Sequence, residues 1–244
     1  MNVSQPAIFH GVRKAYTEPG SGYGIIDHAS FEVPPAACVS LMGSNGSGKS
    51  TLLRIACGLV SPDQGSVRIF GGNPAAEGRV RARIAAMFEG GRALYGRLTP
   101  AENAAYFACM KGFSVALALQ RFRELSERFA VRQYDHVAVR KLSRGTQQKY
   151  ALICSLAGGA DFWLLDEPTL GMDPPSVAIL ASMVREHLQS GGAVLMATHD
   201  LTFASDLGRV IQVADFVLPC EKRRRSLSDD MGVDLSNARQ RPGM

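Results

Sequence analysis

Gly43-Ser44-Asn45-Gly46-Ser47-Gly48-Lys49-Ser50 is the stretch that decides the fold of this 244-residue chain. It joins an apolar, strand-like run at residues 37–42 to a helical pattern at residues 49–58. Its glycines allow the loop to turn backbone N–H groups toward phosphate oxygens, and the start of the helix adds partial positive charge. Together with Thr51, the stretch therefore predicts a loop that binds the phosphates of a nucleotide.

Two side chains at the end of this loop have specific chemistry toward a triphosphate. Lys49 would neutralise the β- and γ-phosphates, and the hydroxyl of Ser50 would bind Mg²⁺. A flexible surface loop is the alternative interpretation of any glycine-rich stretch. The strand before the loop and the helix after it favour the phosphate site, because the motif requires that context.

The rest of the chain alternates short β-rich runs with helical periodicity. This order predicts an α/β fold, a P-loop NTPase core with a mostly parallel sheet. Further strands are expected at residues 66–70, 83–88, 161–165, 193–197 and 209–213.

Helical patterns interrupt this alternation between Thr99 and Ala130. Thr99-Pro100-Ala101-Glu102 has the pattern of a capping box with proline at the first helical position. Phe122, Leu125 and Phe129 then fall on one face of a second helix. We therefore expect a helical subdomain, at about residues 90–158, that is inserted into the α/β core.

A second motif is the apolar strand Phe162-Trp163-Leu164-Leu165 that ends in Asp166-Glu167. Ligands gather at the carboxyl ends of strands in open α/β sheets. Asp166 could hold Mg²⁺, through water, and Glu167 could accept a proton from water that attacks the γ-phosphate. Alone, such a pair commonly marks a strand that meets solvent, but together with the Lys49 loop it predicts nucleoside triphosphate hydrolysis.

Charge limits the partners that the chain can have. Lys and Arg outnumber Asp and Glu by 27 to 22, and residues 221–244 hold six basic and four acidic groups, or +2 of the net +5. The remaining excess is too small to argue for nucleic-acid binding, so we expect none. Because residues 221–244 are mostly charged and polar, we expect a flexible basic and polar tail after a domain at residues 1–220.

Other compositional features indicate a cytoplasmic chain. No apolar stretch approaches the length of a membrane span, and the start lacks the basic and apolar regions of a secretory leader. The five cysteines are scattered without Cys-x-x-Cys spacing. We expect reduced thiols, with neither disulfides nor a zinc site.

Four further segments complete a pattern of six elements. They are Tyr16 in Lys14-Ala15-Tyr16, the run Leu142-Ser143-Arg144-Gly145-Thr146-Gln147-Gln148, the run Leu170-Gly171-Met172-Asp173, and His199 after residues 193–197. With the two motifs above, they make residues 7–218 resemble the ATP-binding subunit of an ABC transporter. In that family the elements are the adenine-stacking aromatic, Walker A, the signature, Walker B, the D-loop and the H-loop.

The resemblance implies ATP and Mg²⁺ as ligands and a role for each element. Tyr16 would stack on the adenine, Asp173 would belong to the nucleotide site through the D-loop, and His199 would touch the γ-phosphate and orient the attacking water. With Lys49 and Glu167, His199 would make up the catalytic group. The resemblance also implies the ABC ATPase fold, with an antiparallel β region near the N-terminus.

The signature segment has a physical logic of its own. Ser143 precedes a helix whose start it can cap, and that helix has an apolar face made of Tyr150, Ile153, Cys154 and Ala157. Taken alone, this segment would be an ordinary helix cap. By the resemblance, Ser143 and Gly145 instead meet the γ-phosphate held by a second ATPase subunit, so hydrolysis implies a dimer, and a homodimer is expected.

Two positions depart from the family pattern. Glu89 stands where the family usually has a glutamine that binds Mg²⁺ and touches the membrane partner; its carboxylate can still bind the metal, so the expected ligands are Ser50, Asp166 and Glu89. In the signature, Arg144 replaces the first glycine and Thr146 replaces glutamine. Gly145 remains, which allows the backbone to approach phosphate closely.

These departures are similar to those of ATPase subunits of ABC-2-type exporters. We expect an ATPase that powers export and is held at the cytoplasmic face of the cell membrane by membrane-spanning permease subunits. Residues 89–98 would contact the coupling helix of such a subunit. An import ATPase, a soluble ABC ATPase that acts on ribosomes or nucleic acid, and a P-loop kinase are the alternatives. The substrate is chosen by the membrane subunits in this family.

Overall fold

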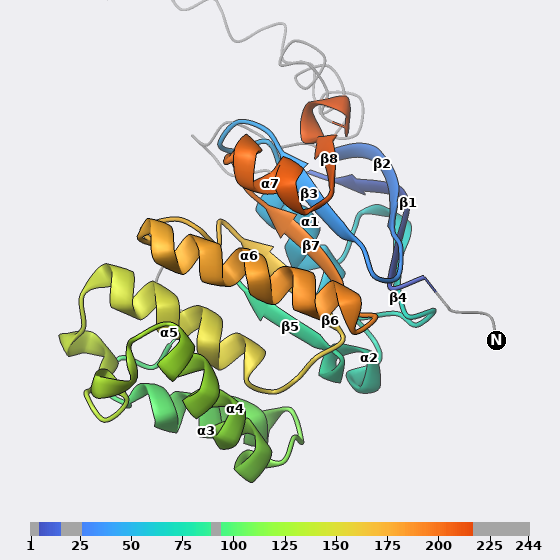
Figure 1. Ribbon diagram of the computed structural model, residues 1–244. Helices are drawn as coiled ribbons and strands as arrows, with labels where there is room; N and C mark the ends of the chain where they lie inside the picture. Colours follow the sequence, from blue (N-terminus) through green and yellow to red (C-terminus); the bar gives the residue numbers. More distant parts are fainter. Residues whose placement is uncertain (1–4, 16–25, 89–93, 217–244) are drawn as a thin grey trace, which may run out of the picture.

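The computed structural model describes residues 5–15, 26–88 and 94–216. Tyr16, Glu89 and the expected tail at residues 221–244 lie outside the described residues. Two sheets and a set of helices make up the described part (Figure 1). The expected combination of a parallel sheet with an antiparallel one is confirmed.

The central sheet has five parallel strands in the order β5-β6-β7-β3-β8. They are β3 (Cys38–Met42), β5 (Ile84–Met87), β6 (Phe162–Asp166), β7 (Ala193–Ala197) and β8 (Arg209–Gln212). Five of the six strands expected from the sequence form this sheet, and no bound differs from the expected one by more than one residue. Every residue of β3, β6 and β7 is buried, and apart from Ser40 and the terminal Asp166 these strands are apolar, as strands buried on both faces require.

A three-stranded antiparallel sheet packs beside the central one. Its order is β2-β1-β4, with β1 (Ala7–Lys14), β2 (Ile26–Val33) and β4 (Gln64–Ile69). The strand expected at residues 66–70 belongs to this sheet. The stacked rings of Phe9 and Phe31, with centroids 4.2 Å apart, pack between β1 and β2.

The central sheet separates two hydrophobic cores, because successive side chains of a strand point to opposite faces. Phe162 and Leu164 of β6 face the core that includes α1 (Lys49–Ala56) and the antiparallel sheet. Trp163 and Leu165 face the other core. There they pack with α5 (Arg144–Leu156), α6 (Pro174–Gln189) and α7 (Leu201–Leu207). A short helix, α2 (Gly78–Ala82), precedes β5, and a 3₁₀ turn, η3 (Val213–Phe216), follows β8.

Helices occupy the described chain between β5 and β6, and they lie at the lower left of Figure 1. They are α3 (Pro100–Met110), α4 (Val115–Arg128), the 3₁₀ turns η1 (Arg132–Tyr134) and η2 (Val139–Lys141), and α5. The capping box is present, since Thr99 Oγ1 accepts from the Glu102 backbone N–H and the Glu102 carboxylate accepts from the Thr99 N–H. That these helices form a subdomain of their own at about residues 90–158 remains a prediction. Across the described residues, no helix has both the length and the apolar character that crossing a bilayer requires.

Candidate nucleotide site

The loop at residues 43–50 connects β3 to α1, as expected from the sequence. Its conformation depends on glycine at Gly48, where φ is +102° and a Cβ atom would lie 2.9 Å from Cγ1 of Ile26. Few L-residues adopt this φ, so the loop could not pass so close to β2 with a side chain here. Ser44, Asn45 and Gly46 are exposed at the tip of the loop. The start of α1 is therefore open to a ligand.

Lys49 lies at the base of this loop and is buried, with 6% exposure. Its Nζ donates to the carbonyl oxygens of Gly43 at 2.7 Å and Ser44 at 3.1 Å. The loop therefore folds around its own ammonium group. A buried cation whose hydrogen bonds among the described residues all go to carbonyl oxygens is well placed to attract a phosphate.

Ser50 and Asp166 join the two motifs across 116 residues of sequence. The hydroxyl of Ser50 donates to Oδ1 of Asp166 at 3.1 Å, and Asp166 is 1% exposed. A hydroxyl and a carboxylate are the hard oxygen donors that Mg²⁺ prefers. The pair lies at the start of α1, beside Lys49, so its chemistry and its place both fit a metal ion that accompanies a triphosphate.

Glu167 follows β6 in an unusual backbone conformation. Its φ is +47°, its backbone N–H donates to the carbonyl oxygen of Ala197 at 2.8 Å, and the residue is 5% exposed. Oε2 of Glu167 lies 2.9 Å from Nδ1 of His199. The two atoms are within ion-pair distance, but their geometry is not that of a hydrogen bond. A non-glycine residue in this region is uncommon and is held by its surroundings. The turn places a buried carboxylate next to an imidazole that is 66% exposed.

These five side chains meet because their strands are neighbours. In the central sheet β6 lies beside β7, and β7 lies beside β3. Lys49 and Ser50 follow β3, Asp166 and Glu167 end β6, and His199 follows β7. All five therefore gather at the carboxyl edge of the sheet, where α/β folds bind their ligands. Ser47 is there too, and its buried hydroxyl has no hydrogen-bond partner among the described residues. A phosphate oxygen would satisfy it.

The signature segment forms a separate group. Ser143 caps α5, as expected, and its Oγ accepts from the Thr146 N–H at 3.2 Å. A Cβ atom on Gly145 would lie 3.1 Å from the carbonyl oxygen of Gly171, so this backbone packs against the turn that follows Glu167. Within the described chain, no hydrogen bond or ion pair connects Ser143 or Gly145 to the loop at residues 43–51.

Asp173 caps α6 and is linked to the signature helix. Oδ1 of Asp173 accepts from the Ser176 N–H at 3.3 Å and lies 3.1 Å from Nζ of Lys149. Hydrogen bonding from Ser176, helped by Lys149, lowers the pKa of Asp173 below its ordinary value. Sequence reasoning missed Lys149. Lys149 lies on α5 beside Gln148. The Nε2 atom of Gln148 lies 3.5 Å from the Glu167 carbonyl oxygen, so this part of α5 faces the turn after β6.

The structure thus brings together the loop at residues 43–51 with Asp166, Glu167 and His199, and it places Ser143, Gly145 and Asp173 at the starts of α5 and α6. The expected adenine contact, Tyr16, and the expected metal ligand, Glu89, lie outside the described residues. Their roles stay predictions.

Comparison with known families and proteins gives consistent results. Residues 26–170 match the family model described as ABC transporter. The ABC transporter ATP-binding protein NatA of Bacillus subtilis is 32% identical over 171 residues, which cover 70% of this chain and 70% of that protein. The cytochrome c biogenesis ATP-binding export protein CcmA of Rhizobium etli is 33% identical over 175 residues, which cover 72% of this chain and 81% of that one.

A solved structure agrees with the fold and shows a cassette of this kind as a dimer. It is the dimeric, post-hydrolysis state of the ATP-binding cassette MJ0796 bound to ADP and Pi. The match has a TM-score of 0.74 and 25% sequence identity, and it covers 84% of this chain and 93% of that one.

Proposed function

The chain belongs to the ABC transporter family, and on that premise we propose that it is the ATP-hydrolysing subunit of an exporter whose membrane-spanning subunits are separate chains. As a member of this family it is an ATP-binding protein and an ATP hydrolase. One observation supports its activity most directly, namely that Lys49, Ser50, Asp166, Glu167 and His199 meet at one edge of the sheet.

The proposed hydrolysis uses these residues in separate roles. Residues 43–51 bind the triphosphate through backbone N–H groups and the ammonium of Lys49. Ser50 and Asp166, with Glu89 as a further candidate, hold Mg²⁺, which neutralises phosphate charge when bound. The Glu167 carboxylate takes a proton from the attacking water, and His199, 2.9 Å from Oε2, orients the reacting groups.

A second copy of the chain would complete the site. Among the described residues, no hydrogen bond or ion pair joins Ser143 or Gly145 to their own phosphate loop. The exposed start of α5 offers backbone N–H groups that have no partner within the helix. We place them on the γ-phosphate bound by the partner subunit, with Asp173 nearby and Tyr16 on the adenine. The dimeric cassette supports this arrangement. Closing and opening of the dimer would then drive the membrane-spanning subunits.

Export is favoured over import by the relatives. CcmA carries the word export in its name, and so does the Nod factor export ATP-binding protein I of Ralstonia nicotianae. The proposed location follows from this function, since separate membrane-spanning partners would hold the ATPase at the cytoplasmic face of the membrane. An import ATPase and a soluble ATPase that acts on ribosomes or nucleic acid are the alternatives.

The decisive experiment identifies the partner. The tagged chain is expressed in its native host, membranes are solubilised in mild detergent, and co-purifying proteins are identified by mass spectrometry, with the untagged strain as control. We expect a protein with several membrane spans in stoichiometric amount. Recovery from the cytosol only, with ribosomes, nucleic acid or no partner, would overturn the transporter assignment.

A further inference from the structure

An open pocket lies at the amino end of β6, whereas the nucleotide site lies at the carboxyl end of the same strand. Residues of α4 and α6 line it, and its volume is about 440 Å³. Its floor is the turn from the end of α5 into β6, which includes Ala160 and Trp163. We call it the α4–α6 pocket. Its volume is in the range of sites that bind small molecules.

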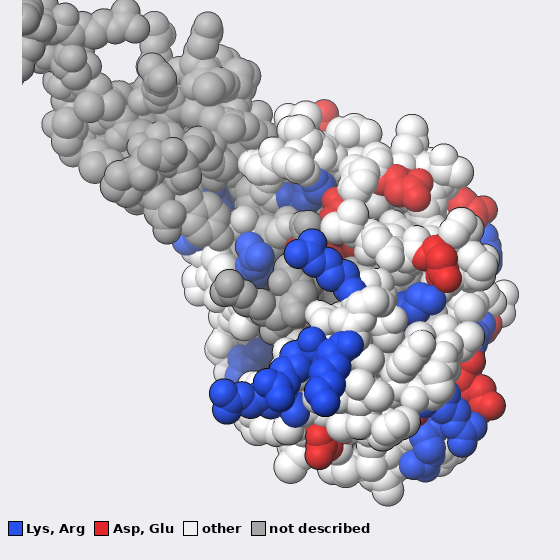
Figure 2. All heavy atoms as spheres, turned by 90° about the vertical axis from the view of Figure 1, so that its left-hand side faces the viewer, with Lys and Arg blue, Asp and Glu red and all other residues white. Residues whose placement is uncertain are grey.

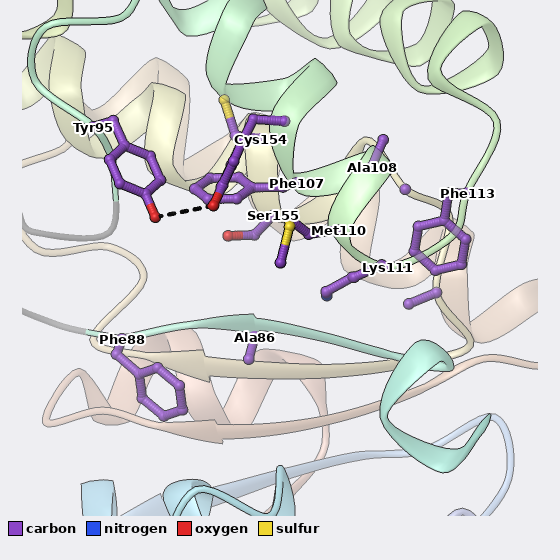
Figure 3. Close-up of a pocket in the computed structure, with 13 residues that line it drawn as sticks. Ala86, Phe88, Tyr95, Phe107, Ala108, Met110, Lys111, Phe113, Cys154 and Ser155 are labelled. Carbon is purple, nitrogen blue, oxygen red and sulfur yellow. Dashed lines mark hydrogen bonds between the residues drawn. The ribbon is translucent and has the colours of Figure 1, made fainter. Parts of the chain in front are cut away.

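The α4–α6 pocket differs from two other features of the surface. The pocket in Figure 3 has Phe88 on its strand side and Tyr95 and Phe107 across the gap, so it includes part of residues 89–98, which are expected to contact the membrane-spanning subunit. Lys and Arg side chains gather on the face that Figure 2 turns toward the viewer. The α4–α6 pocket instead combines charges of both signs with apolar side chains.

Two helices supply the walls of the pocket with one face each. Residues three or four apart on α4 line one wall, namely Arg121, Glu124, Leu125 and Arg128. Residues of α6 and its C-cap repeat this spacing on the other wall, namely Met183, Glu186, His187 and Ser190. Nη1 of Arg128 donates to Oε2 of Glu186 at 2.7 Å, and Nη2 donates to Oγ of Ser182 at 3.1 Å. These bonds connect the two walls, so the pocket is formed before a ligand binds.

The floor of the pocket is apolar. Trp163 is 8% exposed, and Leu156 and Met183 are each 5% exposed. The imidazole of His187 stacks on the indole of Trp163. Gly192 leaves room for this ring, because a Cβ atom there would lie 2.2 Å from Cε1 of His187. An apolar group that rests on this floor is removed from water, which favours its binding.

Most of the charged groups around the pocket are already neutralised. Arg128 forms an ion pair with Glu186 across the walls, and Arg83 forms one with Asp161 at 2.7 Å. Burial lowers the pKa of His187 below its ordinary 6.5, so its ring is neutral at pH 7. None of these groups needs a charge from a ligand.

Arg121 and Glu124 are different. Among the described residues, neither side chain has an ion pair. Nη1 of Arg121 donates to the Gly158 carbonyl oxygen at 3.2 Å, which leaves the other N–H groups of the guanidinium for a ligand. Glycine at Gly159 permits this position, because a Cβ atom there would lie 1.7 Å from Nη1. Oε1 of Glu124 accepts from the amide of Gln120 at 3.0 Å, and a carboxylate can accept further bonds.

We infer that the α4–α6 pocket binds a free α-amino acid with an apolar side chain. The carboxylate of the ligand accepts from Arg121, its ammonium donates to Glu124, and its side chain rests on the floor beside Trp163. Residues three apart on a helix have Cβ atoms about 5–6 Å apart, so Arg121 and Glu124 can reach two groups on one carbon atom. A ligand with a single charge would leave either Arg121 or Glu124 without a partner. This inference goes beyond the proposed function and concerns neither ATP nor the membrane partner.

Titration of the purified full chain tests the binding. Trp163 is the one tryptophan of the sequence and lines the pocket, so its emission reports a ligand there. The probes are L-leucine, L-methionine and L-phenylalanine, and isothermal titration calorimetry measures the same Kd independently. We expect at least one of the three to bind and to change the emission. If none binds by either method, or if binding leaves the emission unchanged, the inference is wrong.

Analogues of the amino acid that binds most tightly test each assigned contact without changing the protein. The N-acetyl derivative lacks the ammonium, the decarboxylated amine lacks the carboxylate, and glycine lacks the apolar side chain. We expect each analogue to bind at least about tenfold more weakly, since each loses a hydrogen bond to a charged group or the burial of an apolar group. An N-acetyl derivative or an amine that binds as tightly as the amino acid would overturn the inference.

Charge removal tests the two residues. Arg121→Gln and Glu124→Gln are compared with Arg123→Gln, at an exposed arginine of α4 outside the pocket. Circular dichroism and the Tm without ligand establish that each variant is folded. We expect both pocket variants to bind the amino acid at least about tenfold more weakly and the control to keep the wild-type Kd. A wild-type Kd in either pocket variant would contradict the assigned contacts. None of these measurements uses ATP or a membrane protein, so a negative result leaves the proposed function standing.

Discussion

Glu167 and His199 lie 2.9 Å apart, Oε2 to Nδ1, at the ends of the neighbouring strands β6 and β7. The carboxylate is buried and the imidazole is mostly exposed. The backbone of Glu167 is tied to β7 by its N–H, which donates to Ala197, and its φ of +47° turns the chain away from the direction of the strand. The turn thus fixes the carboxylate proposed as general base beside the place where phosphate would bind.

Replacing this base should separate ATP binding from hydrolysis. In Glu167→Gln the side chain keeps its shape but cannot take a proton from water, so we expect hydrolysis to fall by about 10²- to 10⁴-fold while ATP still binds. Single-turnover measurement of phosphate release checks the rate, and size-exclusion chromatography should show an ATP-bound dimer that accumulates. Glu124→Gln, at an exposed glutamate of α4, is the control and should behave as wild type. A wild-type rate in Glu167→Gln would remove this residue from the role of base.

Replacement of Lys49 should abolish the rise in Tm that ATP binding produces. Its ammonium bonds to two carbonyl oxygens of the loop, and Lys49→Ala removes both of these bonds and the charge for phosphate. A ligand whose concentration is about 100 times its Kd raises the free energy of unfolding of the protein by about 2.7 kcal/mol. We therefore expect ATP with Mg²⁺ to raise the Tm of wild type and of Lys141→Ala, an exposed lysine, but not that of Lys49→Ala. An undiminished shift in Lys49→Ala would contradict the loop assignment.

The grouping of the candidate site residues was predictable, because it depends on local sequence signals and on one rule of topology. A glycine-rich loop, two carboxylates after an apolar strand and a histidine after another each have a local signal. The rule that ligands gather at the carboxyl ends of parallel strands then brings Lys49, Asp166 and His199 together. The ion pair of Lys149 with Asp173 had no such signal, because it depends on how α5 packs beside the start of α6.

The antiparallel sheet illustrates a second limit on what the sequence alone can predict. We expected it from the family resemblance and not from a pattern in the residues. In β1 the register shifts between Phe9 and Val12, and the alternation of buried and exposed residues is lost there. In β2, His28 adopts a φ of +51° and interrupts the alternation in the same way. Irregular strands of this kind lose the period of two on which recognition from sequence depends.

The capping box of α3 should contribute measurable stability without affecting catalysis. Thr99→Ala removes the acceptor for the Glu102 N–H, and the loss of such a cap costs about 1 kcal/mol. For a chain of this size we expect the Tm to fall by about 2–4 °C. Thermal unfolding followed by circular dichroism measures the change, and Thr202→Ala, an exposed threonine within α7, is the control. If the two variants have equal Tm values, the box does not stabilise the folded protein.

The fluorescence of Trp163 should report the protonation of His187. Trp163 is the one tryptophan of the sequence, and the imidazole of His187 stacks on its indole, with ring centroids 3.9 Å apart and ring planes 9° apart. Burial lowers the pKa of His187 below its ordinary 6.5. The folded protein thus favours the neutral ring. Its contribution to stability is complete above pH 6.5, and it decreases as the pH falls below that value, since the unfolded chain then binds the proton first.

Titration of Trp163 emission under native conditions should therefore show a change whose midpoint lies below pH 6.5, as the imidazolium forms over the indole. In His187→Gln the emission should stay constant over the same range, because no titrating ring faces the indole. His136→Gln, at an exposed histidine outside this stack, should retain the wild-type titration. A midpoint at or above 6.5 would contradict the burial of a neutral imidazole in the stack with Trp163.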